Sequence, residues 1–472
     1  MENFKYFWIV LLGLIIITLA GKPSPILGNP LGDFLRPQLS IQKEKELGEK
    51  VLEEIRSQAE LVDDPSVLSY VDGIGRKILS EMGPQPFKYD FYVIKDYTLN
   101  AFAIPGGHVF INSGLIGAAE GESEIAGVIS HEIGHVVSRH IAKRIEKSGG
   151  LSLLTLIGIL AGSFLSGDAE LSGAVATGSM ALAQTFSLKY SRDDEWEADQ
   201  VGFKNIVSTG YDPRGMICIL KKIMKQSWLE PRKIPPYLST HPAAESRIGH
   251  LKDMIAGLPK KDISQEDQTT LHRVQVKLVI SDRDSREALE YFQAASKKNP
   301  ENANFHYGSA LANQELRRFK ESIRAFKKAI ELAPQDYEIL RDLGICYFFY
   351  GKFNHAVDYL NKSGKLYKKD FLTRYYLGRT YQEMKLFDKA LIAYRKAQDL
   401  NSDFEDIYYH RGIIFGKMNL LGNAHHNLGI FFKLKKERET ALFHFKTALK
   451  SPGLSNMEEK ELLKEIEEIS SE

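Results

Sequence analysis

The chain has 472 residues, more than a single hydrophobic core usually organises, so we expect several domains. Its 62 Lys and Arg residues balance 61 Asp and Glu residues, which argues against nucleic acid as a partner. Two cysteines, Cys218 and Cys346, make a disulfide framework or a thiolate metal site a poor interpretation. Any metal must therefore be held by His and carboxylate side chains.

The amino terminus is typical of a secretory signal. A lysine precedes the uncharged run Tyr6–Gly21, and cleavage is expected after Ala20. The run is shorter than the roughly 20 residues that span a bilayer. Residues 1–21 are therefore interpreted as a signal peptide, and an uncleaved anchor formed by residues 6–21 is the alternative.

A mixed segment follows, in which helices outnumber strands. Residues 22–39 are rich in Pro and Gly and are interpreted as a lead-in. The elements expected next are a helix capped by Ser40, a helix near residues 65–82, a strand in residues 87–95, and two short strands in residues 101–114 that turn at Pro105. From residue 122 onward the pattern is helical.

The carboxy-terminal part repeats. Phe292 and Phe326 stand 34 positions apart, and other small and aromatic residues keep the same step, which is typical of tetratricopeptide repeats. We expect a linker at residues 259–268, the repeat array at 269–454 and a terminal helix or tail at 455–472. Such arrays usually bind peptides or partner surfaces.

The repeat register slips near its end. Gly412 and Ala424 keep the earlier phase, whereas Ala441 and Phe445 are displaced by 17 positions. The slip predicts one inserted helix, half a repeat.

The first candidate for a metal site is a pair of histidines within residues 130–140 (SHEIGHVVSRH). On a helix, His131 and His135 lie one turn apart on the same face, a spacing that lets both imidazoles reach one zinc ion. Glu132 lies beside them and is the expected general base. A helix with two half-exposed histidines is the alternative, but the apolar residues that precede the motif predict a buried helix, where unpaired polar groups are costly.

A third ligand is expected about 60 residues later, in YSRDDEWEADQVG. Glu195 and Asp199 share one face of a predicted helix, and small Ala198 between them allows close approach to another helix. Glu195 completes a His₂Glu zinc site with one open position. Asp199 is then placed to accept the second ring N–H of a zinc ligand. Glu197 would point away round the helix.

The stretches HEIGH and SRDDEWEAD, with NAFAIPGGHVFINSGLI before them and STHPAAESRI after them, resemble the zinc metallopeptidases related to HtpX, Oma and the CAAX prenyl protease. The signal and the repeats are most similar to the exported, BepA-like branch. The resemblance places the peptidase domain at residues 40–258. It implies a mainly α fold: an α+β zincin-type domain with a small sheet, followed by an α-solenoid of tetratricopeptide repeats.

The resemblance also assigns residues. It makes Glu195 the third ligand, places Asn100 and Ala103 beside an extended substrate, and maps a His-Pro motif to His241, which can occupy the open zinc position and hold the enzyme latent. Arg247 matches an arginine near the site. His241 or Arg247 is a candidate donor to the oxyanion, with latency or a structural role as the alternative.

Residues 148–188 are almost free of charge and rich in apolar and small side chains. We expect short helices that pack over the active site or contact a membrane surface. A membrane hairpin is the alternative.

These features predict a zinc-dependent endopeptidase with one Zn²⁺ per chain. By resemblance it acts in the periplasm on misfolded or misassembled envelope proteins, with the outer-membrane barrel assembly machinery as a partner. The alternative is a periplasmic chaperone or scaffold in which the repeat array does most of the work and the protease is mostly latent.

Overall fold

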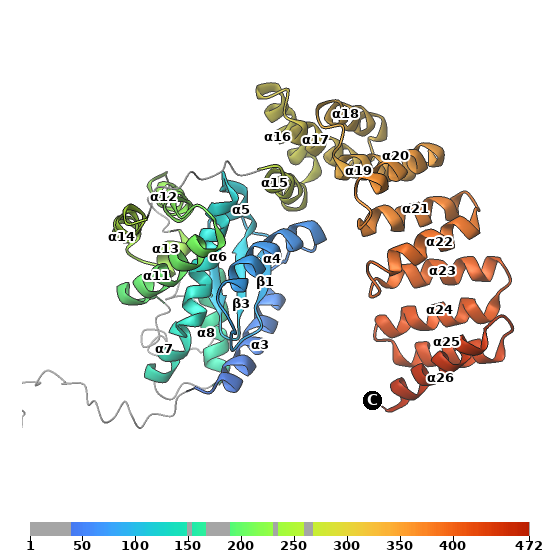
Figure 1. Cartoon of the computed structure of the whole chain (residues 1–472), viewed down its shortest axis with the longest axis horizontal. Coiled ribbons are helices and arrows are strands. Elements are labelled where there is room, and N and C mark those ends of the chain that lie inside the picture. The colour runs from blue at the N-terminus through green and yellow to red at the C-terminus, as the bar shows by residue number, and fades with distance from the viewer. Residues whose placement is uncertain (1–38, 149–152, 167–188, 230–234, 259–267, 472) are drawn as a thin grey trace, which may run out of the picture. The chain divides into compact units, whose positions relative to one another are not determined.

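The computed structural model describes residues 39–148, 153–166, 189–229, 235–258 and 268–471 (Figure 1). Three of the expected features lie wholly or largely outside these residues: the signal segment, the lead-in up to residue 38 and the linker at 259–267. The described residues form two compact units. The first unit comprises the described residues up to Leu61 and those within Val71–Ser264. The second unit comprises Val62–Tyr70 and the described residues within Gln265–Glu472.

The first unit combines a small sheet with helices, as expected. Helix α4 (Pro65–Ser80) begins in the residues of the second unit and ends in those of the first. The strands are β1 (Asp90–Ile94), β2 (Ala101–Ile104) and β3 (His108–Asn112), and the other helices are α3 (Ile41–Gln58), α5 (Ser113–Ala118), α6 (Glu122–Val137), α7 (His140–Ser148), α8 (Leu153–Ser166), α11 (Arg192–Thr209), α12 (Arg214–Leu229), α13 (Pro236–Thr240) and α14 (Ala244–Ala256).

The sheet has the strand order β1, β3, β2. Strand β3 pairs in parallel with β1 and antiparallel with β2. The hairpin between β2 and β3 turns through Gly106 and Gly107, whose φ angles of 89° and 98° favour glycine. Strand β2 is an edge strand, so one side of its backbone has no strand partner among the described residues.

Helix α8 belongs to the core of this unit. Ile159, Leu160 and Phe164 are buried in one hydrophobic cluster with residues of α3 and the sheet, and the Phe164 ring stacks on that of Phe102 at 4.6 Å. Residues 153–166 of the apolar segment are therefore a packed helix, while residues 149–152 and 167–188, on which the rest of this expectation falls, lie outside the described part. In the described ranges, no helix has the length and apolar character needed to cross a bilayer.

Helix α6 is central, and α11 packs closely against it. Every residue of α6 from Ser123 to Val136 is buried. The contact is close because it uses small residues: a Cβ added at Gly134 would lie 2.7 Å from the carbonyl oxygen of Ala198. The close approach predicted at Ala198 is confirmed.

Replacing Gly134 with Ala is expected to lower the free energy of unfolding by about 1–3 kcal/mol, because the new methyl group has no room between the two helices. Urea denaturation measures this. Gly249→Ala in α14 is the control, since an added Cβ meets no atom within 4 Å there. Equal stability of the two variants would contradict the close contact.

The second unit is a continuous series of helical pairs. Its helices are α15 (Thr269–Asp282), α16 (Ser285–Lys298), α17 (Ala303–Glu315), α18 (Phe319–Leu332), α19 (Tyr337–Phe349), α20 (Phe353–Leu366), α21 (Phe371–Glu383), α22 (Phe387–Gln398), α23 (Glu405–Lys417), α24 (Leu421–Leu434), α25 (Arg438–Lys450) and α26 (Asn456–Ser471). Aromatic rings pack against small residues between paired helices: Phe292 packs against Gly308, and Tyr394 packs against Gly378.

Helix α24 accounts for the register slip. It packs against α23 through Gly412, whose added Cβ would meet Leu428 at 3.0 Å. It also packs against α25, because Gly429 faces Phe445. One helix thus serves as the second member of one pair and the first member of the next, which is the inserted half repeat that the sequence predicts.

Candidate metal centre

The side chains of two histidines on α6 converge. His131 and His135 are one helical turn apart, and their Nε2 atoms lie 3.0 Å from each other. Both rings are buried. The helical spacing therefore brings the two imidazoles together as the sequence predicts.

Glu195 reaches the same spot from α11. This helix begins with a capping box, in which the side chains of Ser191 and Asp194 bond each other's backbone N–H. Glu195 lies in the first turn, with Oε2 at 3.5 Å from Nε2 of His131 and Oε1 at 3.6 Å from Nε2 of His135. Burial raises the pKa of Glu195, but Arg247 and His241 outweigh it and hold that pKa well below its usual range.

His241 joins this group from the end of α13. Its Nδ1 lies 3.0 Å from Oε1 of Glu195, and its ring stacks on Tyr237 with centroids 4.4 Å apart. One ligand atom each from His131, His135, Glu195 and His241 fall within 4.8 Å of one another. The structure thus assembles the three expected ligands and His241.

Asp199 and Arg247 lie directly behind the ligands. Oδ1 of Asp199 is 2.9 Å from Nδ1 of His131, as expected for a residue that fixes the histidine tautomer. Arg247 donates from Nε and Nη2 to Asp199 at 2.8 and 2.7 Å, and its Nη1 is 2.6 Å from Oε2 of Glu195. Burial raises the pKa of Asp199, but Arg247 and His131 hold it at about 2. The guanidinium of Arg247 is therefore occupied by two carboxylates.

Glu132 is fully buried beside the ligands. Neither of its carboxylate oxygens has a hydrogen-bond partner among the described residues, and Nε2 of His241 is 3.7 Å from Oε1. Burial raises the pKa of Glu132. A buried carboxylate without a partner is costly to a fold, so its retention favours a role in chemistry.

The donor set fits a zinc ion. Two imidazoles and a carboxylate are the ligands of open catalytic zinc sites. Besides Glu132, the buried Nε2 of His241 has no hydrogen-bond partner within the described part of the chain. His131, His135 and Glu195 would hold the ion, with His241 next to the remaining position.

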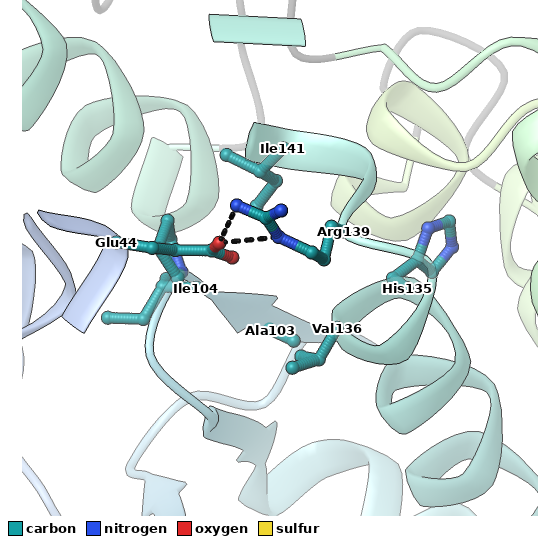
Figure 2. A pocket seen from close by; sticks show the side chains of 8 residues that line it. Glu44, Ala103, Ile104, His135, Val136, Arg139 and Ile141 are labelled. Atoms are coloured by element: carbon teal, nitrogen blue, oxygen red, sulfur yellow. Dashed lines mark hydrogen bonds and ion pairs between the residues drawn. The ribbon is translucent and has the colours of Figure 1, made fainter. Parts of the chain in front are cut away.

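Of the two residues expected beside the substrate, Ala103 lies in a pocket that His135 also lines, and Asn100 bonds to α8. Ala103 is in the edge strand β2 and lines a small pocket together with His135 (Figure 2). Asn100 precedes β2 and is buried, and its Nδ2 donates to the carbonyl oxygen of Phe164 at 3.3 Å. The side chain of Asn100 thus ties the edge strand to α8.

Figure 2 also shows an ion pair at the rim of this pocket. Arg139 donates from Nε to Oε2 of buried Glu44 at 2.8 Å, which ties the end of α6 to α3. Both residues line the same pocket as His135.

Three residues of the site were not predicted. Tyr190 stacks on His135 with centroids 3.9 Å apart, Tyr237 stacks on His241, and His140 approaches Nδ1 of His135. His140 is the last residue of the stretch SHEIGHVVSRH. It lies five positions after His135, a spacing that does not place two residues on the same face of a helix. The excluded ligand Glu197 is half-exposed and pairs with His140 instead.

The chain matches known families in both units. Residues 67–255 match peptidase family M48, and residues 275–337 and 373–404 match tetratricopeptide repeats. With the zinc-type ligand cluster, this defines the class: the chain carries a metallopeptidase domain of family M48, followed by a tetratricopeptide repeat array.

The chain is also similar to particular proteases. The chain is 28% identical over 318 residues to a putative beta-barrel assembly-enhancing protease of Vibrio cholerae, covering 66% of this chain and 65% of that protein. It is 26% identical over 306 residues to the beta-barrel assembly-enhancing protease of Escherichia coli, covering 64% and 63%. It is 27% identical over 237 residues to the mitochondrial metalloendopeptidase OMA1 of Schizosaccharomyces pombe, covering 50% and 66%. Each alignment thus leaves about a third of the relative unmatched.

Proposed function

We propose that this protein is a zinc-dependent endopeptidase that hydrolyses misfolded or misassembled proteins of the cell envelope. The observation that carries the proposal is the convergence of His131, His135 and Glu195 beside a buried Glu132 that has no hydrogen-bond partner among the described residues. Bound zinc supplies a Lewis acid that activates water and polarises a peptide carbonyl. The rest of the chemistry belongs to side chains of this chain.

Glu132 is the general base. Its free carboxylate accepts a proton from the attacking water and returns it to the leaving amine. Its raised pKa suits the first step, because a carboxylate with a higher pKa is a stronger base toward the attacking water. Asp199 keeps the proton of His131 on Nδ1, which would leave Nε2 to bind the metal, and Arg247 holds Asp199 and Glu195 in place.

His241 holds the site closed. Its ring belongs to the ligand cluster, and its Nε2, which has no hydrogen-bond partner among the described residues, lies 3.7 Å from Oε1 of the proposed base Glu132. This arrangement favours latency over oxyanion binding. Arg247 is already committed to two carboxylates, so we assign it a positioning role.

Replacing His241 with Ala is therefore expected to increase kcat/KM for a short unstructured peptide, while the zinc content stays unchanged. Steady-state cleavage of a fluorogenic peptide measures the first and elemental mass spectrometry measures the second. A fall in kcat/KM with zinc retained would instead indicate that His241 stabilises the oxyanion.

Substrates are expected to bind in extended form. The edge strand β2, with Ala103 beside His135, has no strand on its outer side among the described residues, and we assign it as the strand that pairs with an extended peptide. The repeat array is the recruiting surface, and the relatives named beta-barrel assembly-enhancing proteases support outer-membrane barrel proteins and their assembly machinery as clients and partner. We place the protein in the periplasm, with membrane-surface contact through residues 148–188.

The proposal is tested with the purified full-length chain and a barrel protein of the outer membrane. The unfolded barrel protein is expected to be cut in the presence of zinc, and the same protein folded in detergent micelles is expected to survive. Chelation should abolish cleavage, and added zinc should restore it. If neither the wild type nor His241→Ala cuts the unfolded protein while holding zinc, the proposal fails.

A chaperone or scaffold role is the second candidate, favoured by the position of His241 within the ligand cluster. In a strain lacking the gene, we would compare rescue by Glu132→Gln with rescue by residues 1–268 alone. Rescue by Glu132→Gln would assign the main work to the repeat array, and rescue by the truncated chain would assign it to the protease.

A further inference from the structure

His140 stands directly behind a proposed zinc ligand. After α6 ends, Arg139 adopts a left-handed conformation with φ of 52°, and α7 begins at His140. This sharp reversal returns the His140 ring to the side of α6, with Nδ1 at 2.8 Å from Nδ1 of His135. The His140 side chain is buried at the first position of α7.

The contact fixes where the protons lie. Two Nδ1 atoms at hydrogen-bond distance share one proton. If His135 binds metal through Nε2, its Nδ1 carries the proton and donates, so Nδ1 of His140 accepts. The proton of His140 is then on Nε2, which lies 3.1 Å from Oε2 of Glu197, an oxygen that accepts. In this single arrangement of protons, each hydrogen bond in the series from His135 through His140 to Glu197 has one donor and one acceptor.

Stacking alone does not orient His135. The Tyr190 ring lies nearly parallel to it, at 27°. A half-turn of the imidazole about its Cβ–Cγ bond leaves that stacking unchanged but moves Nε2 away from the metal. A hydrogen bond from Nδ1 distinguishes the two orientations, and His140 supplies the acceptor.

We propose that His140 is a positioning residue: it fixes the tautomer and the ring orientation of His135, and Glu197 fixes His140 in turn. The two histidine ligands are then held differently. His131 is backed by the buried carboxylate of Asp199, which Arg247 neutralises, whereas His135 is backed by an imidazole whose own partner is half-exposed. Hydrogen-bond partners of this kind contribute about 10- to 100-fold to metal affinity.

This inference rests on the proposed zinc site but not on peptide cleavage, so its test measures zinc affinity. The full-length chain and its variants compete for zinc with a chromophoric chelator. His140→Leu, which keeps an apolar side chain without an acceptor, is expected to weaken zinc binding about 10- to 100-fold. His140→Asn is expected to retain most of the affinity, because its Oδ1 can take the place of Nδ1.

The metal-free proteins provide the second readout. A purely structural role for His140 predicts that His140→Leu and His140→Asn lose zinc affinity equally, in step with their loss of stability in the presence of chelator. That result, or wild-type affinity in His140→Leu, overturns the inference. Failure of the wild type itself to bind zinc would reject the proposed function, which is a separate outcome.

Discussion

Replacing Glu132 with Gln is expected to leave zinc binding intact and to lower peptide cleavage by a factor of about 10² to 10⁴. The amide has the shape of the carboxylate but accepts no proton. No hydrogen bond to the described residues is lost, because neither oxygen of Glu132 makes one. Zinc content by elemental mass spectrometry and kcat/KM on a fluorogenic peptide measure the two effects.

The matched control is Glu122→Gln, at the start of the same helix. Glu122 accepts a hydrogen bond from the hydroxyl of Tyr211 at 2.9 Å, which an amide oxygen can also accept. This variant is expected to cleave like the wild type. Proteolysis retained in Glu132→Gln would remove Glu132 from the role of base.

Replacing Glu195 with Ala is expected to abolish zinc binding and to destabilise the metal-free protein as well. The substitution removes one of three ligands and one of the two carboxylates paired with buried Arg247. Removing one partner from a buried ion pair costs about 3–5 kcal/mol. Urea denaturation in the presence of chelator measures the stability effect, and equilibrium dialysis measures zinc binding.

Gln200→Ala, at an exposed position of the same helix, is the control and is expected to bind zinc and to unfold like the wild type. Glu195→Gln separates the loss of the side chain's charge from the loss of its volume, because the amide keeps the volume but not the charge. If Glu195→Ala still held one zinc ion, another carboxylate would have to be the ligand.

The sequence predicted the features that depend on local periodicity. One helical turn between His131 and His135 brings their side chains together in any α-helix, and this spacing held. The spacing of four positions between Glu195 and Asp199 predicted that they share one face of α11, and both are buried on that helix. The small residues of the repeats predicted where aromatic rings would pack.

Contacts between residues far apart in the sequence could not be predicted from local sequence patterns. His241 is 46 positions from Glu195, and only the family resemblance pointed to it. The parallel pairing of β1 with β3 joins strands separated by β2. His140 was missed because its approach to His135 requires a left-handed residue, Arg139, which carries no sequence signal.

The most direct test of the central claim is the number of zinc ions per chain in the purified full-length protein after chelation, zinc addition and removal of excess metal. The account predicts one ion in the wild type and in Glu132→Gln, and none in Glu195→Ala. A wild-type chain that takes up no zinc, or a Glu195→Ala chain that takes up as much as the wild type, would contradict it.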